Sequence, residues 1–469
     1  MVMNKSGLKI ALLSCLLMSA TAFSQTDKDK IAASQAGASP IYFNASAANI
    51  PLIEPGNFYK ELECSARLGL PAFFEKISLG KKVVVAFIGG SITQANFGYR
   101  LQTARYLEEA YPRVNFEWIN AGVSGTGTEL GAFRIKEQVL NQRPDLIFIE
   151  FAVNGAYPGG MEGMIRQTIK ENPKTNICLL YTILTGQSAF YQKNELPPNI
   201  EGLERVAAHY GLPAVNLGMQ AAALEAEGKL IWKGNAPTES KILFSEDGIH
   251  PTTAGGNLYA AAIARAFQKM EKIKPEQKKV LPAPLITAAW DEATMLPPSA
   301  VAISVSGWQL MPTGTDPNLK KFSPWFSDVL MANKPGATFS FRFKGDMVGV
   351  FDIGGPEVGQ LEWTIDGKPV KLNREKEGNF IYYQAVETTG DEALNRFNAY
   401  CNNRYRGQFD VIKVAPGAHL VQVKVSARQA NKLEILPEDK RADMVSHPEK
   451  YNQSVIYLGR ILLRGTLLK

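Results

Sequence analysis

The stretch that decides the fold is Val83-Val84-Val85-Ala86-Phe87-Ile88-Gly89-Gly90-Ser91. Its apolar residues run without the polar alternation of a half-exposed strand, which predicts a strand that is buried on both faces. Two glycines and a serine follow directly, so a hydroxyl stands where the strand ends. Parallel sheets bind their ligands at the carboxyl ends of the strands. The stretch therefore predicts both a central parallel strand and a functional Ser91.

Apolar runs and helical stretches alternate from this strand to about residue 270. The expected strands cover residues 83–88, 114–120, 146–151, 177–184 and 214–217. The expected helices cover residues 98–111, 131–140, 161–171, 200–210 and 253–269. This alternation predicts an α/β domain of three layers, in which helices cover both faces of a parallel sheet.

A second motif, Asp247-Gly248-Ile249-His250-Pro251, lies far downstream, just before the last expected helix. A serine hydroxyl is a poor nucleophile until a histidine takes its proton and a carboxylate orients that histidine. Ser91, His250 and Asp247 supply these three groups. Taken alone, Ser91 fits a helix N-cap and Asp247-Gly248 fits a turn.

Two more polar or flexible positions follow strands of the same domain. Gly125 comes after the second strand, and Asn154 comes after the third. Asn154-Gly155 alone would indicate a turn. Because four such positions coincide at strand ends in one order, a catalytic site explains them better than separate structural roles do.

The four blocks resemble those of the SGNH/GDSL hydrolase family, in this order: Gly-x-Ser, Asn-x-x-x-x-Gly, Asn and Asp-x-x-His. The resemblance covers residues 81–272 and implies a flavodoxin-like fold. It implies that Ser91 is the nucleophile, His250 the base and Asp247 the acid that orients it. It also implies an oxyanion hole made of the Ser91 N–H, the Gly125 N–H and the Asn154 side chain. No metal or cofactor is implied.

Two positions depart from the family pattern. Gly90 stands where the family's namesake has Asp, and Gly155 stands after Asn154 where Asp is frequent. Neither departure touches the triad or the oxyanion hole, so it bears on subfamily and substrate, not on the chemistry. The opening Gly-Gly-Ser-Ile-Thr at residues 89–93 is similar to that of exported carbohydrate esterases of the family.

The residues that would contact substrate are harder to read from the pattern. The segment 185–198 follows the fourth strand and is expected beside the mouth of the site. Its Phe190 and Tyr191 either stack on a sugar ring or pin the loop to the core. Gln94 and Tyr157 are two further candidate contacts. The absence of a long hydrophobic lid in the sequence disfavours a lipase that acts at an interface.

The N-terminus is typical of a secretory signal peptide, expected to span residues 1–24. Two lysines precede an apolar run at residues 10–18, and small residues follow it. The run is shorter than the 20 or so residues of a membrane span. The alternative is a lipid anchor at Cys15, because Leu12-Leu13-Ser14-Cys15 resembles a bacterial lipobox. Either way, we expect a periplasmic or extracellular protein.

Composition excludes some classes of protein. With 469 residues, 45% of them hydrophobic and 20% charged, the chain is globular. The formal net charge is +6, with basic and acidic residues interspersed, so no nucleic-acid partner is expected. Without Cys15 an odd number of cysteines remains, Cys64, Cys178 and Cys401, which allows at most one internal disulfide. None of them has metal-ligand spacing.

The composition changes after residue 271, where a charged and proline-rich linker begins. Short alternating runs with almost no helical period then predict a β-sandwich, jelly-roll-like, over residues 285–469. Asp366-Gly367 and Pro416-Gly417 are expected to be turns between its strands. This module either binds glycan or only braces the catalytic domain. Residues 25–80 are expected to form an arm that wraps onto one of the two domains.

Together these features predict a secreted serine esterase that removes acyl groups, above all acetyl, from a carbohydrate through an acyl-enzyme. The substrate is expected to be an acylated carbohydrate or another small ester. The first alternative is another enzyme with the same triad, such as a lipase, an arylesterase or an O-acyltransferase. The second is a glycan-binding protein with a vestigial hydrolase domain.

Overall fold

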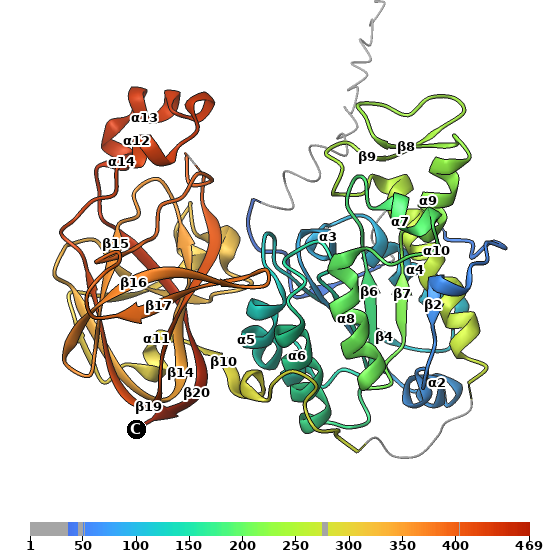
Figure 1. Ribbon diagram of the computed structural model, residues 1–469, viewed down its shortest axis with the longest axis horizontal. Helices are drawn as coiled ribbons and strands as arrows, with labels where there is room; N and C mark the ends of the chain where they lie inside the picture. The colour runs from blue at the N-terminus through green and yellow to red at the C-terminus, as the bar shows by residue number, and fades with distance from the viewer. Residues whose placement is uncertain (1–35, 46–49, 51, 274–279, 403) are drawn as a thin grey trace, which may run out of the picture.

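The computed structural model describes residues 36–45, 50, 52–273, 280–402 and 404–469. The predicted signal peptide, Cys15 and the first part of the predicted arm lie outside the described residues. Two domains lie side by side, an α/β domain and a strand-rich C-terminal domain (Figure 1). None of the helices in the described ranges combines the length and the apolar character needed to span a bilayer.

The α/β domain is built on a seven-stranded sheet with the order β1-β4-β3-β5-β6-β7-β2. Its central strands are parallel to one another: β3 (Val83–Gly89), β4 (Phe116–Gly122), β5 (Leu146–Glu150), β6 (Asn176–Tyr181) and β7 (Ala214–Asn216). Counted along the chain, they stand in the order second, first, third, fourth, fifth. This is the flavodoxin-like order, so the predicted fold is confirmed.

Both edges of this sheet come from the N-terminal arm. β1 (Tyr42–Phe43) pairs antiparallel with β4, and β2 (Cys64–Ser65) pairs antiparallel with β7. The arm therefore wraps onto the α/β domain at two opposite edges of one sheet. A short helix, α2 (Pro71–Ser78), then leads into β3.

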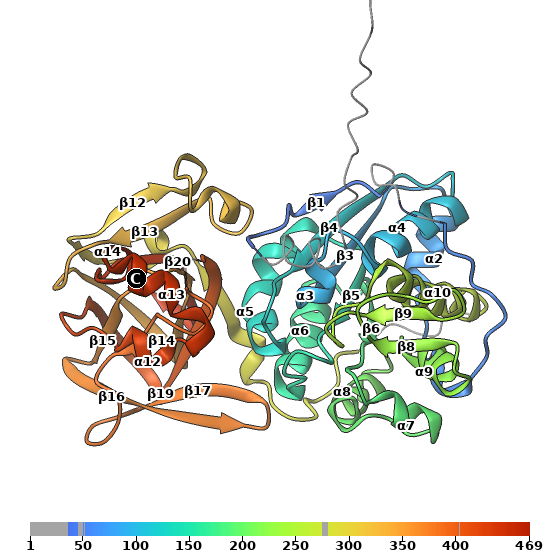
Figure 2. The same cartoon turned by 90° about the horizontal axis from the view of Figure 1, so that it is seen from above.

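Helices cover both faces of the sheet (Figure 2). On one face, α4 (Tyr99–Ala110) packs on α10 (Thr253–Met270). On the other, α6 (Pro158–Glu171) packs on α5 (Thr128–Gln138) and α8 (Pro198–His209). Every residue of β3 is buried, as an apolar strand between two helical layers must be. The shorter elements are α3 (Ser91–Gln94), α7 (Ser188–Gln192), α9 (Met219–Ala226), β8 (Leu230–Lys233) and β9 (Ile242–Ser245).

The C-terminal domain is an eleven-stranded, mostly antiparallel sheet with a core of its own. Its centre is formed by three long strands, β14 (Thr338–Gly354), β19 (Arg406–Val425) and β20 (Ile456–Leu468). This is the strand-rich module that the sequence predicts. The other strands are β10 (Ala293–Leu296), β11 (Ser304–Ser306), β12 (Gln309–Pro312), β13 (Asp328–Ala332), β15 (Gln360–Ile365), β16 (Lys368–Glu377), β17 (Phe380–Val386) and β18 (Leu394–Asn395). Its helices are one turn or little more: α11 (Pro298–Val301), α12 (Lys432–Ile435), α13 (Ala442–Ser446) and α14 (Pro448–Tyr451).

One of the two predicted turns is wrong. Asp366-Gly367 does join β15 to β16, with both residues at positive φ. Pro416-Gly417 is not a turn, because β19 runs through it and Gly417 pairs with Gly345 of β14. The ladder between β14 and β19 shifts register between Gly345 and Met347, and this bulge takes up Pro416. A proline without an N–H is tolerated where the ladder is interrupted.

The two domains share a packed contact around α5 and α6, which face the C-terminal domain (Figure 1). Trp290, in the segment that joins the domains, is fully buried and packs edge-on against Phe133 of α5 at 5.5 Å between ring centroids. Arg460 of β20 binds both carboxylate oxygens of Glu137 of α5, at 2.8 Å from Nη2 and 3.0 Å from Nε. Apolar side chains from both domains form one continuous cluster, so the contact between the domains is packed like a core.

Candidate active site

The sheet brings Ser91 and His250 together at the carboxyl ends of its strands. Ser91 is the first residue of α3, directly after β3, and His250 stands in the loop between β9 and α10. His250 Nε2 lies 2.7 Å from Ser91 Oγ, and His250 Nδ1 lies 2.6 Å from Asp247 Oδ2. If His250 donates its Nδ1–H to Asp247, its Nε2 is left to accept the hydroxyl proton of Ser91.

Asp247 is held as an anion. Burial opposes its ionisation, but the hydrogen bonds that it accepts from His250 and Ile249 outweigh burial and hold the pKa of this carboxyl well below its usual range. The backbone N–H groups of Ile249 and His250 both donate to Oδ1 at 2.8 Å, and Ser245 Oγ lies 3.1 Å from the same oxygen. The carboxylate therefore keeps its charge and its orientation toward the imidazole.

The turn that carries Asp247 and His250 is fastened to the loop after β6. Gly248 has φ +87°, and its carbonyl accepts hydrogen bonds from the backbone N–H and the Oγ1 of Thr185, both at 2.9 Å. A Cβ at Gly248 would stand 2.1 Å from Thr185 Oγ1. The turn therefore requires glycine at this position.

Gly125 and Asn154, the two further residues of the predicted oxyanion hole, lie in the lining of the cavity that contains Ser91. Gly125 has φ +73°. In the part of the chain that the structure describes, no hydrogen bond engages the Asn154 side chain. Its amide is thus available to a ligand, which is what stabilisation of a developing oxyanion requires.

The geometry explains the glycine at position 90. A Cβ on Gly90 would stand only 2.0 Å from Asn154 Nδ2. Any side chain there, including the Asp of the family's namesake, would displace the Asn154 amide from the backbone of Gly90. The departure from the family pattern is therefore coupled to the position of an expected oxyanion donor.

The cavity that contains these groups has a volume of about 400 Å³ and lies between the two domains. The α/β domain and the arm supply one wall: Gly37, Ser91, Ser124, Gly125, Val153, Asn154, Ile249 and His250. The C-terminal domain supplies the other: Phe322, Trp325, Tyr400, Arg404, Arg406 and Gly407. Substrate that reaches Ser91 therefore contacts both domains.

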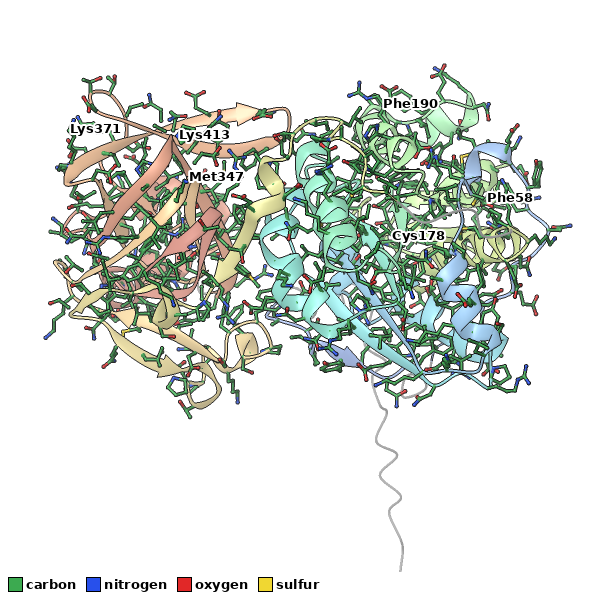
Figure 3. All side chains as sticks on the ribbon, turned by 90° about the horizontal axis from the view of Figure 1, so that it is seen from below. Phe58, Cys178, Phe190, Met347, Lys371 and Lys413 are labelled. Carbon is green, nitrogen blue, oxygen red and sulfur yellow. The ribbon has the colours of Figure 1, made fainter. Side chains whose placement is uncertain are left out.

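The four predicted substrate contacts do not belong to the described residues that line this cavity, and the structure corrects these expectations. Tyr157 is buried at the domain contact, where its hydroxyl donates to Glu377 at 2.9 Å. Tyr191 is buried and donates to Asn216, so it pins its loop to the core. Phe190 lies half-buried on α7, away from the contact between the domains (Figure 3).

Gln94 supports the wall of the cavity instead of lining it. Its Oε1 accepts a hydrogen bond from the backbone N–H of Ser124 at 2.5 Å, next to Gly125. Its Nε2 donates to the carbonyl of Gly37 in the arm at 2.6 Å. Gln94 thus fixes the loop that presents the Gly125 N–H.

Sequence reasoning missed the side chains of the C-terminal wall, Phe322, Trp325, Tyr400, Arg404 and Arg406. They lie in a region without any catalytic motif, and packing of the two domains alone brings them to the site. The one signal in the sequence is their composition, since aromatic and arginine side chains are enriched at recognition surfaces.

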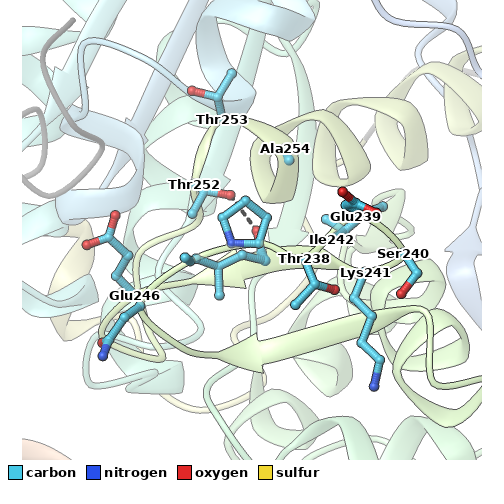
Figure 4. Close-up of a pocket in the computed structure, with 13 residues that line it drawn as sticks. Thr238, Glu239, Ser240, Lys241, Ile242, Glu246, Thr252, Thr253 and Ala254 are labelled. Atoms are coloured by element: carbon cyan, nitrogen blue, oxygen red, sulfur yellow. Dashed lines mark hydrogen bonds between the residues drawn. The ribbon is translucent and has the colours of Figure 1, made fainter. Parts of the chain in front are cut away.

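A second cavity, of about 640 Å³, opens beside the triad-bearing loop (Figure 4). It lies under the segment between β8 and β9 and includes Thr238, Lys241, Glu246 and Thr253 among its lining. It contains none of Ser91, Asp247 and His250.

Among the described residues, no group of three or more His, Cys, Asp or Glu side chains could hold a metal ion. Cys64, Cys178 and Cys401 are buried free thiols.

A doubly wound α/β domain with a serine, a histidine and an ionised aspartate in hydrogen-bond contact is the architecture of a serine hydrolase. Comparison with known proteins refines this class. Residues 87–258 match the family model of the GDSL-like Lipase/Acylhydrolase family. An acetylxylan esterase of Geobacillus stearothermophilus is 23% identical in an alignment of 218 residues that covers 40% of this chain and 95% of that protein.

Solved structures extend the likeness to both domains. A two-domain esterase (CEX) active on acetylated mannans, co-crystallised with mannopentaose, aligns with a TM-score of 0.58 at 20% identity, over 84% of this chain and 93% of that one. The structure of CEX described without mannopentaose aligns with the same TM-score and identity, over 84% of this chain and 94% of that one. The arrangement of the two domains is thus a shared fold.

The α/β domain therefore resembles the SGNH/GDSL hydrolases, and the comparisons support a carboxylic ester hydrolase with a C-terminal strand-rich domain.

Proposed function

We propose that this protein is an exported acetylesterase that removes acetyl groups from an O-acetylated carbohydrate. The observation that carries the proposal is the unbroken contact from Asp247 through His250 to Ser91 in a cavity lined by two domains. The names of the relatives, an acetylxylan esterase and an esterase active on acetylated mannans, support the substrate class.

The geometry supports an acyl-enzyme mechanism. His250 Nε2 takes the proton as Ser91 Oγ attacks the acetyl carbonyl, and Asp247 stabilises the imidazolium that forms. The Ser91 and Gly125 N–H groups and the Asn154 amide hold the negative charge on the carbonyl oxygen. His250 then gives the proton to the departing sugar oxygen. Water, deprotonated by the same His250, attacks the acetyl-serine and releases acetate.

The test is a panel of esters with acetate release as the readout. The purified protein is incubated with p-nitrophenyl acetate, p-nitrophenyl octanoate, acetylated xylan and acetylated mannan, with Ser91→Ala as the blank. We expect acetate from at least one polysaccharide and weak activity on the octanoate. A preference for the octanoate would turn the proposal toward a lipase. Acetyl transfer to an added sugar, in place of acetate release, would turn it toward an acyltransferase.

Export is part of the proposal and rests on the sequence of residues 1–24. Expression in a bacterium with separate analysis of the periplasm tests it. We expect a mature chain that begins after Ala22 or Ser24, as measured by intact mass. A chain that begins at Cys15 with the mass of a lipid would establish the anchored alternative, and retention of Met1 would contradict export.

A further inference from the structure

Two arginine side chains of the C-terminal domain line the cavity opposite the catalytic wall, which is the wall that the α/β domain and the arm supply. Arg404 and Arg406 line the cavity together with Ser91 and His250. Arg406 Nη2 lies 3.0 Å from the position that a Cβ on Gly125 would take. The guanidinium therefore crosses the domain boundary and rests against the loop that forms the expected oxyanion hole.

Arg406 is half-buried, and it differs from the buried arginines of its domain in having no carboxylate partner among the described residues. Arg396 binds Asp352 through Nε at 2.9 Å and Nη2 at 2.6 Å, and Arg464 binds Asp346 in the same two-pronged way at 2.7 Å. In the part of the chain that the structure describes, Arg406 forms no ion pair. Its guanidinium instead lies over the ring of Tyr400, at 4.6 Å from the centroid.

Arg404 adds positive charge beside Arg406. Burial, together with the nearby Arg404, lowers the pKa of Arg406, and burial and Arg404 also lower the pKa of Lys321. Two carboxylates bonded to residues in or next to the cavity lining, Glu357 and Asp247, already have partners. Glu357 accepts hydrogen bonds from the hydroxyls of Tyr405 and Tyr457, at 2.9 and 2.8 Å. Asp247 is bound to His250.

We propose that Arg406, supported by Arg404, binds a carboxylate of the substrate, so that the preferred substrate is an O-acetylated saccharide that contains uronic acid. The inference rests on the proposed function and narrows it from carbohydrates in general to acidic ones. A planar guanidinium matches a carboxylate with two parallel hydrogen bonds. A partly buried cation without a counterion in the protein gains most from a ligand that brings one.

Kinetics on a matched pair of substrates tests the inference. One substrate is an acetylated oligogalacturonide, and the other is the same oligosaccharide with its carboxyl groups reduced to alcohols. We expect kcat/KM to be about 10- to 100-fold higher for the acidic member, the range that charged hydrogen bonds give. We also expect this preference to shrink as salt is added.

Variants assign the preference to Arg406. Arg406→Gln is expected to bring the ratio of the two kcat/KM values close to one. Arg406→Lys is expected to keep part of the preference, since lysine retains the charge but lacks the two parallel N–H donors of the guanidinium. Arg342→Gln is the matched control, because Arg342 is an exposed arginine of the same domain outside the cavity. A ratio near one in the native protein would overturn the inference. An equal loss on both substrates in Arg406→Gln would also overturn it.

A binding measurement separates this inference from the proposed function. Calorimetry with the Ser91→Ala protein compares a non-acetylated oligogalacturonide with its carboxyl-reduced form. Tighter binding of the acidic form, lost in the double variant with Arg406→Gln, supports the inference even if no saccharide releases acetate, a result that would refute the proposed function alone. Equal binding of the two forms overturns the inference whatever the esterase assays show.

Discussion

The two walls of the cavity are held in different ways. On the α/β wall, hydrogen bonds fix the reactive groups and their loops, as Asp247 holds His250 and Gln94 holds the loop of Gly125. On the C-terminal wall, the Arg406 guanidinium lies over the Tyr400 ring, 4.6 Å from its centroid. Fixed donors suit a transition state of one geometry, whereas aromatic faces and guanidinium groups suit recognition of a sugar. Under the proposed function, we therefore expect the α/β wall to perform the chemistry and the C-terminal wall to select the substrate.

The largest effect is expected from the carboxylate of the catalytic wall. Asp247→Asn should lower kcat by about 10⁴-fold, because the amide cannot hold the imidazole tautomer that accepts the Ser91 proton. Hydrolysis of p-nitrophenyl acetate measures this loss, and circular dichroism checks the fold. Asp328→Asn, which alters a carboxylate of β13 outside the cavity, should leave kcat unchanged. A loss of less than tenfold in Asp247→Asn would contradict the assigned role.

The oxyanion donor should give the next largest effect. Asn154→Ala is expected to lower kcat by about 10²- to 10³-fold. The melting temperature should change little, because no hydrogen bond within the described residues engages this side chain. Gly90→Ala should impair turnover as well, since its Cβ would displace the Asn154 amide. Unchanged ester turnover in Asn154→Ala would count against an oxyanion role.

A buried carboxyl group behind the catalytic wall makes stability depend on pH. Burial raises the pKa of Glu129 to about 7 in the folded protein, and its Oε2 has no hydrogen-bond partner. Below the unfolded pKa, near 4.5, the group is neutral in both states. As pH rises from there to about 7, the unfolded state loses the proton first, so the free energy of unfolding falls, by up to about 3 kcal/mol.

Glu129→Gln should remove that dependence. Urea unfolding at pH 5 and pH 8 measures it: the native protein should lose stability between the two values through this group, and the variant should lose less. Glu109→Gln, which alters an exposed acid of α4, is the control. Equal changes in the native protein and in Glu129→Gln would show that Glu129 is not the group responsible.

The smallest change in activity is expected from a variant on the C-terminal wall of the cavity. Tyr400 is 56% exposed, and its removal should raise KM for an acetylated oligosaccharide by about 5- to 10-fold, the range of one aromatic contact. The change in kcat/KM for p-nitrophenyl acetate should be smaller, because this ester has no sugar. Tyr59→Ala, at an exposed tyrosine of the arm, is the control. An equal loss of kcat/KM on both esters would indicate that Tyr400 contributes to the chemical step and not to sugar binding.

The sequence alone predicts which residues of the α/β domain lie at the strand ends, but it does not predict which residues of the C-terminal domain line the cavity. Apolar runs predict the parallel strands, and the family resemblance implies their order. Motifs at strand ends place Ser91 and His250 at one edge of the sheet. Arg406 reaches Gly125 only through packing of the two domains, which leaves no local pattern. The position of Tyr157 is set in the same way, because its partner Glu377 comes from the other domain.

The two short strands contributed by the arm determine which truncated forms of this enzyme can keep an intact sheet. β1 and β2 close opposite edges of the parallel sheet. A fragment limited to residues 87–258, the part that matches the family model, would lose both edge strands and part of β3. Its outermost strands would then offer unpaired backbone groups to other chains, which is a route to aggregation. A usable catalytic fragment must therefore start before Tyr42, upstream of the family match.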